Sequence, residues 1–227
     1  MLEKVTQVND SELALARHNM IEQQIRPWDV LDERVLKLLD DVPRDQFVPS
    51  AYHRLAYADT NIPLGHDQVM MPPRVEARLV QALEIKPTDD ILEVGTGSGY
   101  LTALLATAGH QVYSVDIFPD FVEQARTVLQ RHRIRNVTLE TGDAAQGWDK
   151  HGPYDVIAVT GSVPVLPEAF KADLRPGGRM FVVVGDPPVM EALLITRVGP
   201  QAWIQESMFE TELPALINAT QPTRFVF

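Results

Sequence analysis

The sequence predicts an α/β fold with a mostly parallel, doubly wound sheet, extra helices at the N-terminus and an antiparallel edge at the C-terminus. Two observations lead to this prediction. From residue 74 to residue 184, short apolar runs alternate with segments of helical periodicity, as in parallel strands joined by crossover helices. The first apolar run ends in glycines at positions 95, 97 and 99 and leads directly into a helical segment. Such a turn allows a ligand to approach the backbone closely.

The N-terminal third is predicted to contribute helices and a long loop. One helix is expected over residues 10–26, beginning at Asp10 or Ser11 and ending before Pro27, and a second over residues 32–40. Five prolines interrupt residues 43–73, so this stretch is predicted to be largely irregular, with a short helix near residues 51–57. A loop of this length inside a compact domain is typical of a lid or a binding loop.

The remaining elements follow from the same patterns. A helix is expected from residue 74 to residue 83, followed by strands over residues 91–94, 111–115, 137–141, 156–160 and 180–184. The intervening helices are expected over residues 100–107, 119–131 and 166–173, and hairpin strands in the tail over residues 191–197, 202–208 and 224–227. No linker divides the chain. Residues 1–73 are therefore expected to cover the active site as part of the same domain as a ligand-binding core of residues 74–227.

Composition and charge exclude several function classes. The 227 residues carry a formal net charge of −11, which repels a nucleic-acid backbone, and no dense basic patch offsets it. The absence of cysteine excludes disulfides, thiolate metal ligands and a cysteine nucleophile, and the six histidines show no metal-ligand spacing. The N-terminus has no apolar core of signal-peptide length, and no window approaches the ~20 apolar residues of a membrane span. We expect a cytoplasmic monomer or homodimer without metal, nucleic acid or membrane partners.

The glycine turn distinguishes two classes of cofactor. A dinucleotide fingerprint, Gly-x-Gly-x-x-Gly, needs glycine at position 100, where this chain has Tyr100. The observed Gly-x-Gly-x-Gly run, two residues after Glu93, resembles the loop of S-adenosylmethionine-dependent methyltransferases, whose product is S-adenosylhomocysteine. The free N–H groups that begin the next helix would then face the methionine carboxylate. The alternative is a tight turn that uses glycine for positive φ alone. The candidate cofactor residues of this loop are Glu93, Gly95, Thr96, Gly97, Ser98, Gly99 and Tyr100.

Two acidic residues lie at the ends of the next predicted strands. Asp116 follows the second strand, where a carboxylate can accept hydrogen bonds from both ribose hydroxyls. Asp143 follows the third strand, where its side chain and the next N–H can bind an adenine edge. Either could be a solvated strand-end residue. Because the carboxyl ends of parallel strands share one edge of the sheet, the combination favours one cofactor site, to which we also assign Ile117, Ala144 and Thr160.

Over most of its length, from about Asn19 to Val184, the chain resembles the protein-L-isoaspartate (D-aspartate) O-methyltransferases. The most specific stretches are Val-Pro-Arg-Asp-Gln-Phe-Val-Pro at residues 42–49 and Gly-Thr-Gly-Ser-Gly-Tyr at residues 95–100. The resemblance implies a Rossmann-like methyltransferase fold and S-adenosylmethionine as cofactor. It further implies methyl transfer to the α-carboxyl of isoaspartyl residues in damaged proteins or peptides, the first step of their repair. The loop before residue 74 would cover the cofactor and shape the acceptor pocket.

The acceptor region departs from the family pattern. Where the family has Thr-Ile-Ser-x-Pro, residues 69–73 read Val-Met-Met-Pro-Pro, so Val69 and Met71 replace two hydroxyl side chains. Methionine offers no donor to a carboxylate, and a buried carboxylate without partners is costly. Isoaspartyl activity would survive if backbone N–H groups and the side chains of Thr160, Ser162 and Arg74 hold the acceptor.

Two alternatives stay open beside this interpretation. A more apolar small-molecule acceptor could contact Val69, Met70 and Met71, because methionine adapts to irregular apolar ligands, and isoaspartyl activity would then be weak or absent. For a hydroxyl acceptor, His66 could serve as the base, although a structural hydrogen bond would explain it equally well. The chain could also be a cofactor-binding protein that no longer catalyses.

Overall fold

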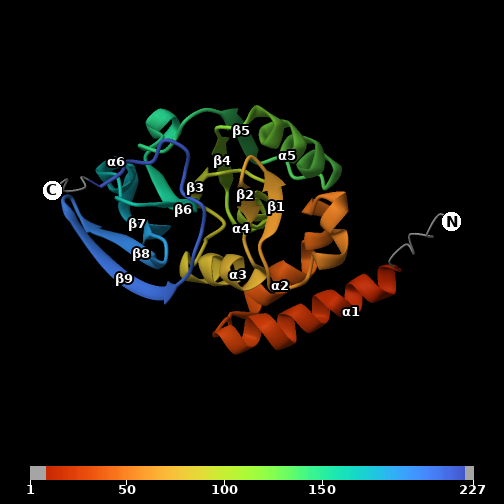
Figure 1. Ribbon diagram of the computed structural model, residues 1–227. Coiled ribbons are helices and arrows are strands. Elements are labelled where there is room, and N and C mark those ends of the chain that lie inside the picture. The colour runs from red at the N-terminus through yellow and green to blue at the C-terminus, as the bar shows by residue number, and fades with distance from the viewer. Residues whose placement is uncertain (1–8, 223–227) are drawn as a thin grey trace.

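The sheet predicted from the sequence forms the centre of the molecule (Figure 1). The computed structural model describes residues 9–222, so the strand expected over residues 224–227 lies outside the described part. Seven strands follow the order β5-β4-β3-β6-β7-β8-β9, and neighbours are parallel from β5 through β7 and antiparallel beyond it. Their bounds are β3 Asp90–Val94, β4 Gln111–Asp116, β5 Val137–Thr141, β6 Tyr154–Val163, β7 Leu174–Asp186, β8 Val189–Gly199 and β9 Ala202–Glu210. The predicted fold class, with its antiparallel C-terminal edge, is confirmed.

Helices cover both faces of this sheet. Successive strand residues point to opposite faces, so Ile91 packs in one apolar cluster with the N-terminal helices and Leu92 in a second cluster with Phe170. The first cluster also contains residues from the segment before residue 74, so both parts of the chain contribute to it. The helices are α2 Glu33–Asp41, α3 Pro73–Ala82, α4 Tyr100–Ala108, α5 Pro119–Arg131 and α6 Glu168–Ala172.

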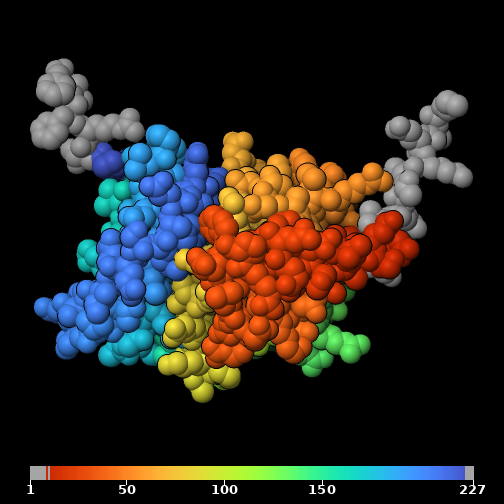
Figure 2. Space-filling view, turned by 90° about the horizontal axis from the view of Figure 1, so that it is seen from below, coloured from red at the N-terminus to blue at the C-terminus, as the bar shows by residue number. Residues whose placement is uncertain are grey.

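The N-terminal helix is capped and then changes its geometry. Asn9 caps α1, Asp10–Met20, with a capping box completed by Glu12. A π-helical turn, Ile21–Ile25, and a 3₁₀ turn, Arg26–Trp28, continue it. The helical stretch therefore includes Pro27 and ends at Trp28, not before Pro27 as predicted, because the first turn of a helix tolerates proline. Figure 2 shows this region beside α3 and the blue C-terminal strands, where the ring of Trp28 packs edge-on against Phe209 of β9 at 5.4 Å.

The prediction of a largely irregular segment over residues 43–73 is wrong for its last part. Two short strands, β1 Ile62–Gly65 and β2 Gln68–Met70, pair as a hairpin. His66 and Asp67 form its turn with φ of 51° and 57°, a conformation that a two-residue hairpin turn requires and that Asp and His tolerate better than most residues. The proline at position 63 concealed the strand, because proline is compatible only with an edge or a bulge. The short helix near residues 51–57 exists as a 3₁₀ helix, Ser50–Leu55.

The strand order places a ligand site beside β3. The chain runs outward from β3 to β4 and β5, then returns to pair β6 with the other side of β3. In open α/β sheets, ligands bind outside the carboxyl ends of strands where the order reverses. Strand β6 is irregular there, because its pairing with β7 shifts between Ala158 and Ser162. Because of this bulge, Thr160 and Gly161 do not take part in the regular hydrogen-bonded ladder between β6 and β7. They lie at the same edge of the sheet as the glycine loop.

Candidate active site

The glycine loop after β3 has the backbone geometry that only glycine adopts easily. Gly95, Gly97 and Gly99 have φ of 99°, 50° and 80°. A Cβ atom at position 95 would lie 2.1 Å from the Thr160 Oγ1, and one at position 97 would lie 3.2 Å from the Leu64 side chain. The glycines therefore do more than reverse the chain direction. Because they lack side chains, the side chains of Thr160 and Leu64 can pack directly against the backbone of the turn.

A network of buried hydrogen bonds between side chains supports the glycine loop from the protein interior. The Glu93 carboxyl accepts hydrogen bonds from Thr102 Oγ1 at 2.5 Å and from Ser114 Oγ at 2.6 Å, and the Ser114 hydroxyl contacts that of Thr96 at 2.6 Å. Burial raises the pKa of Glu93 to about 8. Glu93 is fully buried and lies outside the residues that line the cavity, so its carboxyl shapes the loop from behind.

Gly99 and Tyr100 likewise face the protein interior. A Cβ atom at position 99 would lie 3.0 Å from that of Ala125 in α5. The Tyr100 ring is completely buried beside Phe47 and under the guanidinium of Arg44. Of the loop residues predicted to hold the cofactor, the structure thus brings Gly95, Thr96, Gly97 and Ser98 to cavity walls, whereas Gly99 and the Tyr100 ring pack away from them.

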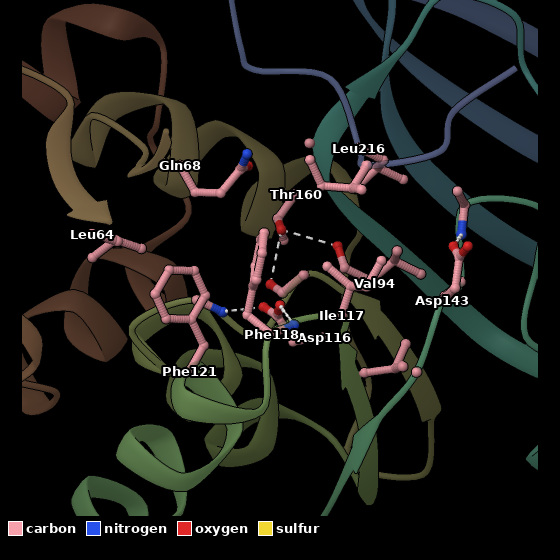
Figure 3. Close-up of a pocket in the computed structure, with 18 of the residues that line it drawn as sticks. Leu64, Gln68, Val94, Asp116, Ile117, Phe118, Phe121, Asp143, Thr160 and Leu216 are labelled. Atoms are coloured by element: carbon pink, nitrogen blue, oxygen red, sulfur yellow. Dashed lines mark hydrogen bonds between the residues drawn. The ribbon is translucent and has the colours of Figure 1, made fainter. Parts of the chain in front are cut away.

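A pocket opens at the ends of β3, β4, β5 and β6 (Figure 3). It encloses about 580 Å³ of empty space, part of which is open to solvent. The predicted residues Asp116, Ile117, Asp143, Ala144 and Thr160 all line it. Two phenylalanines, Phe118 and Phe121, and the apolar tail residues Leu216 and Ile217 complete the wall, and the sequence patterns did not single these out.

Asp116 has the hydrogen-bonding capacity expected of a ribose acceptor. Its two oxygens accept from the N–H groups of Gly97 at 2.9 Å and Phe118 at 3.0 Å. A carboxylate offers about four lone-pair sites, so two remain for a ligand. Burial raises its pKa from the ordinary value, against the lowering by these N–H donors. The same contacts fix the carboxylate relative to the glycine loop.

A smaller cavity adjoins this pocket and shares Leu64, Val69, Gly95, Gly97 and Thr160 with it. Val69, Met70 and Met71, which the sequence analysis considered as contacts of an apolar acceptor, form its apolar side, and Ser98 and Glu76 supply polar groups. The Thr160 hydroxyl lies 2.9 Å from the carbonyl oxygen of Val94 and 2.8 Å from that of Gly95, so its proton is directed to backbone. The two cavities meet at the Gly95–Thr160 contact.

The sequence analysis missed a buried ion pair at this second cavity. Arg44 and Glu76 are both buried and pair directly, and Arg44 also donates to the carbonyl oxygens of Ala56 at 2.9 Å and Met71 at 2.6 Å. Burial raises the pKa of Glu76 to about 7, although Arg44 opposes this rise. The signal in the sequence that could have revealed this ion pair was a glutamate on the apolar face of α3. Its partner is 32 residues away in the chain and could not be recognised from spacing.

Three residues considered for acceptor chemistry have other contacts. The His66 ring stacks on Phe118 with centroids 4.1 Å apart, and its Nε2 lies 3.0 Å from Asp120 Oδ2. His66 is outside the lining of both cavities. The Ser162 hydroxyl donates to the Leu213 carbonyl at 3.0 Å, and Arg74 pairs with Asp59 at 2.9 Å.

Two further searches covered the described part of the chain. Within residues 9–222, no group of three or more His, Cys, Asp or Glu side chains is arranged to hold a metal ion. The helices in this range are all too short or too polar to cross a membrane.

Comparison with known proteins identifies the family. Residues 15–210 match the family model described as protein-L-isoaspartate(D-aspartate) O-methyltransferase. A protein-L-isoaspartate O-methyltransferase from Gloeobacter violaceus is 36% identical over 190 residues, which cover 84% of this chain and 93% of that protein. Protein-L-isoaspartate O-methyltransferase 1 from Anaeromyxobacter is 42% identical over 165 residues, which cover 72% and 78% of the two chains.

A solved structure supports the fold independently. The Plasmodium falciparum protein-L-isoaspartate O-methyltransferase, in complex with S-adenosyl-L-homocysteine, superimposes with a TM-score of 0.74 at 21% identity. The match covers 89% of this chain and 97% of that one. The glycine loop, the two strand-end carboxylates and the adjoining smaller cavity thus lie in a chain that belongs to the protein-L-isoaspartate(D-aspartate) O-methyltransferase family.

Proposed function

We propose that this chain transfers the methyl group of S-adenosylmethionine to the carboxyl group of isoaspartyl residues in damaged proteins or peptides. The observation that carries the proposal is the contact between two cavities at Gly95 and Thr160. One cavity has the groups for a nucleoside-bearing cofactor, and the other adjoins it and is lined by the Ser98 hydroxyl and an apolar wall. Direct methyl transfer needs such adjacent sites, because donor and acceptor must meet without an intermediate carrier.

The residues of the larger pocket fit this cofactor. The glycines of the loop let the Thr160 and Leu64 side chains of the pocket wall pack against its backbone. Asp116 retains acceptor capacity for two hydroxyl groups. Asp143 and the apolar residues around it suit an adenine ring, with a polar edge and two flat faces. The loop and the start of α4 would hold the carboxylate end through N–H groups.

Methyl transfer requires position more than acid–base chemistry. S-adenosylmethionine supplies an electrophilic methyl group on a sulfonium, so transfer forms an O–C bond while the C–S bond breaks with its electron pair to sulfur. A carboxylate oxygen is already a nucleophile and needs no base. The protein's residues therefore have to bind the acceptor, orient one oxygen and exclude water. The hairpin β1–β2 and the strand-end residues supply the walls for this.

Ser98 is our candidate for binding the acceptor carboxylate. Its hydroxyl oxygen accepts a hydrogen bond from the Tyr100 N–H at 3.3 Å. In none of the hydrogen bonds described within residues 9–222 does the Ser98 hydroxyl act as the donor. Ser98 lines the second cavity, where Val69 and Met71 offer no donor. The Ser98 hydroxyl would then replace one of the missing side-chain donors.

The alternative functions are not favoured. The family match extends over residues 69–73, so the altered acceptor run belongs to the matched region. The curated relatives named above cover most of the chain and carry isoaspartate in their names. A different, more apolar acceptor and a protein without catalysis both lack a comparable observation.

The test is methyl transfer from labelled S-adenosylmethionine to a synthetic isoaspartyl peptide, with the same peptide carrying a normal aspartate as the control. We expect label in the isoaspartyl peptide alone, as a base-labile ester. Binding of S-adenosylhomocysteine without any transfer would overturn the proposed acceptor but leave the cofactor assignment. Failure to bind S-adenosylhomocysteine would overturn both.

A further inference from the structure

The C-terminal segment returns to the cofactor pocket after the last strand. Residues 211–220, here called the strap, leave β9 and run beside the end of β6. The Ser162 N–H donates to the Pro214 carbonyl and the Leu216 N–H donates to the Ser162 carbonyl, each at 2.9 Å. Leu213 is 2% exposed and anchors the start of the strap in the core. The strap lies beyond the residues that match the family model, which end at 210.

Leu216 fills the space above a glycine at the pocket edge. A Cβ atom at position 161 would lie 2.7 Å from Leu216 Cδ2 and 3.3 Å from the Pro214 carbonyl oxygen. Leu216 and Ile217 both line the larger pocket, and Figure 3 shows Leu216 beside Val94, between Thr160 and Asp143. This is the part of the pocket that we assign to adenosine.

Asn218 holds the second acidic residue of the pocket. Its side-chain N–H donates to Asp143 Oδ2 at 2.8 Å, while Asp143 Oδ1 accepts from the Ala145 N–H at 3.0 Å. Both oxygens of Asp143 are therefore engaged, which fixes the plane of the carboxylate. Asn218 has a φ of 65°, a left-handed conformation that asparagine tolerates better than most residues. Farther along, the side chains of Thr220 and Gln146 bond to each other at 2.9 Å.

We propose that the strap completes the adenosine half of the cofactor site, with Leu216 in contact with the nucleoside and Asn218 as a positioning residue for Asp143. This inference rests on the proposed cofactor site. An apolar side chain against a planar base removes water from both surfaces, and a fixed carboxylate loses less freedom when it accepts a hydrogen bond from the base or ribose. Affinity for the cofactor then depends on a segment outside the parallel core.

The test is the Kd of S-adenosylhomocysteine, measured by calorimetry on the full chain. We expect Leu216→Ala to raise the Kd about tenfold and Leu216→Met to restore it to within about twofold. Asn218→Gly keeps the left-handed backbone but removes the donor, and should raise the Kd about threefold. Asn218→Asp should raise it further, because it places a second carboxylate beside Asp143.

The control is Thr220→Val, which alters the strap without touching the pocket wall or Asp143 and should leave the Kd unchanged. Steady-state kinetics separate a local from a general effect. The variants should raise KM for S-adenosylmethionine, while kcat and KM for an isoaspartyl peptide stay near the wild-type values. Both Asn218 substitutions are at an exposed position, so they keep the proposal testable even if Leu216→Ala unfolds.

If the wild-type enzyme binds S-adenosylhomocysteine and methylates the peptide, and Leu216→Ala and Asn218→Asp bind with the same affinity as wild type, the proposed role of the strap is overturned and the proposed function is not. Equal losses in kcat and in both KM values would also overturn it, because they indicate a general structural defect. A wild-type protein that binds no S-adenosylhomocysteine would overturn the proposed function as well.

Discussion

Gly95 and Thr160 meet across the ends of β3 and β6, where a Cβ atom at position 95 would lie 2.1 Å from the Thr160 Oγ1. The Thr160 hydroxyl occupies this space and lies within 2.9 Å of the carbonyl oxygens of both Val94 and Gly95. The Thr160 side chain of β6 is thus hydrogen-bonded to the end of β3 at the point where the two cavities meet. Glycine at position 95 is required for that contact.

Replacing Gly95 with alanine should weaken cofactor binding strongly. The new methyl group would displace Thr160 and strain a residue with a φ of 99°, so the loop and both cavities would shift. We expect the Kd of S-adenosylhomocysteine to rise at least tenfold in calorimetry. Gly177→Ala is the matched control, because Gly177 also has a positive φ of 80° but no atom within 4 Å of its added Cβ. It should cost about 1–2 kcal/mol of stability and keep wild-type affinity. Equal affinity in the two variants would contradict the steric argument.

Replacing Asp116 with asparagine should weaken cofactor binding without unfolding the protein. The amide oxygen can keep one of the two backbone N–H contacts, but the charge and a share of the acceptor sites are lost. Hydrogen bonds to charged groups contribute about 1.5–3 kcal/mol, so we expect the Kd of S-adenosylhomocysteine to rise about 10- to 150-fold. KM for the peptide should not change. An unchanged Kd would remove Asp116 from the ribose site.

Glu93 should make the protein less stable as the pH rises. Its pKa in the folded state is about 8, against an ordinary value of 4.5, so the folded protein keeps a proton that the unfolded chain releases. The free energy of unfolding then falls between pH 4.5 and pH 8, by at most about 1.4 kcal/mol per pH unit, and levels off above pH 8. Glu93→Gln cannot ionise and should flatten this decline.

Urea unfolding at a series of pH values measures the effect. The clearest interval lies between pH 7 and pH 8, because Glu76, with a pKa of about 7, adds its own decline at lower pH. The control is Glu168→Gln, whose glutamate side chain is 80% exposed and should leave the wild-type curve unchanged. Parallel curves for wild type and Glu93→Gln would show that Glu93 is ionised in the folded protein.

Local patterns predicted most of the parallel core because each of its elements carries its own signal. Alternating apolar runs and helical periodicity located β3 to β7 to within a few residues at the ends that reach the site, and the rule for parallel strands placed Asp116 and Asp143 at one edge. The hairpin β1–β2 was missed, since its proline argues against a strand unless the strand is known to lie at an edge.

The orientation of side chains was harder to predict than their position in the chain. Glu93 is only two residues from Gly95, yet it points beneath the loop to Ser114 and Thr102. The Arg44–Glu76 pair and the strap depend on contacts between distant segments, which no local pattern encodes. Sequence motifs therefore identified residues that meet in one pocket, but they did not predict the side-chain contacts around the smaller cavity.

Restoring a hydroxyl at position 69 should improve the acceptor site. Val69 lines both cavities and is half-buried, and threonine has nearly its shape, so Val69→Thr adds a donor without opening space. A hydrogen bond to a charged carboxylate is worth about 1.5–3 kcal/mol, so kcat/KM for an isoaspartyl peptide should rise at least about tenfold. The Kd of S-adenosylhomocysteine should stay constant. Val137→Thr, in β5 and outside both cavities, should leave kcat/KM unchanged. No gain in Val69→Thr would place the acceptor carboxylate elsewhere.

Replacing His66 should affect cofactor binding more than catalysis. Its ring stacks on Phe118, which lines the cofactor pocket, and its Nε2 bonds to Asp120, whose pKa this contact holds below the ordinary value. In His66→Ala, Phe118 loses its support, so KM for S-adenosylmethionine should rise several-fold while kcat stays within about threefold of wild type. Asp120→Asn keeps the stacked rings and should give a smaller rise in KM. If kcat instead collapses at saturating cofactor in His66→Ala but not in Asp120→Asn, His66 is the base, and the acceptor must then be a group that needs deprotonation rather than a carboxylate.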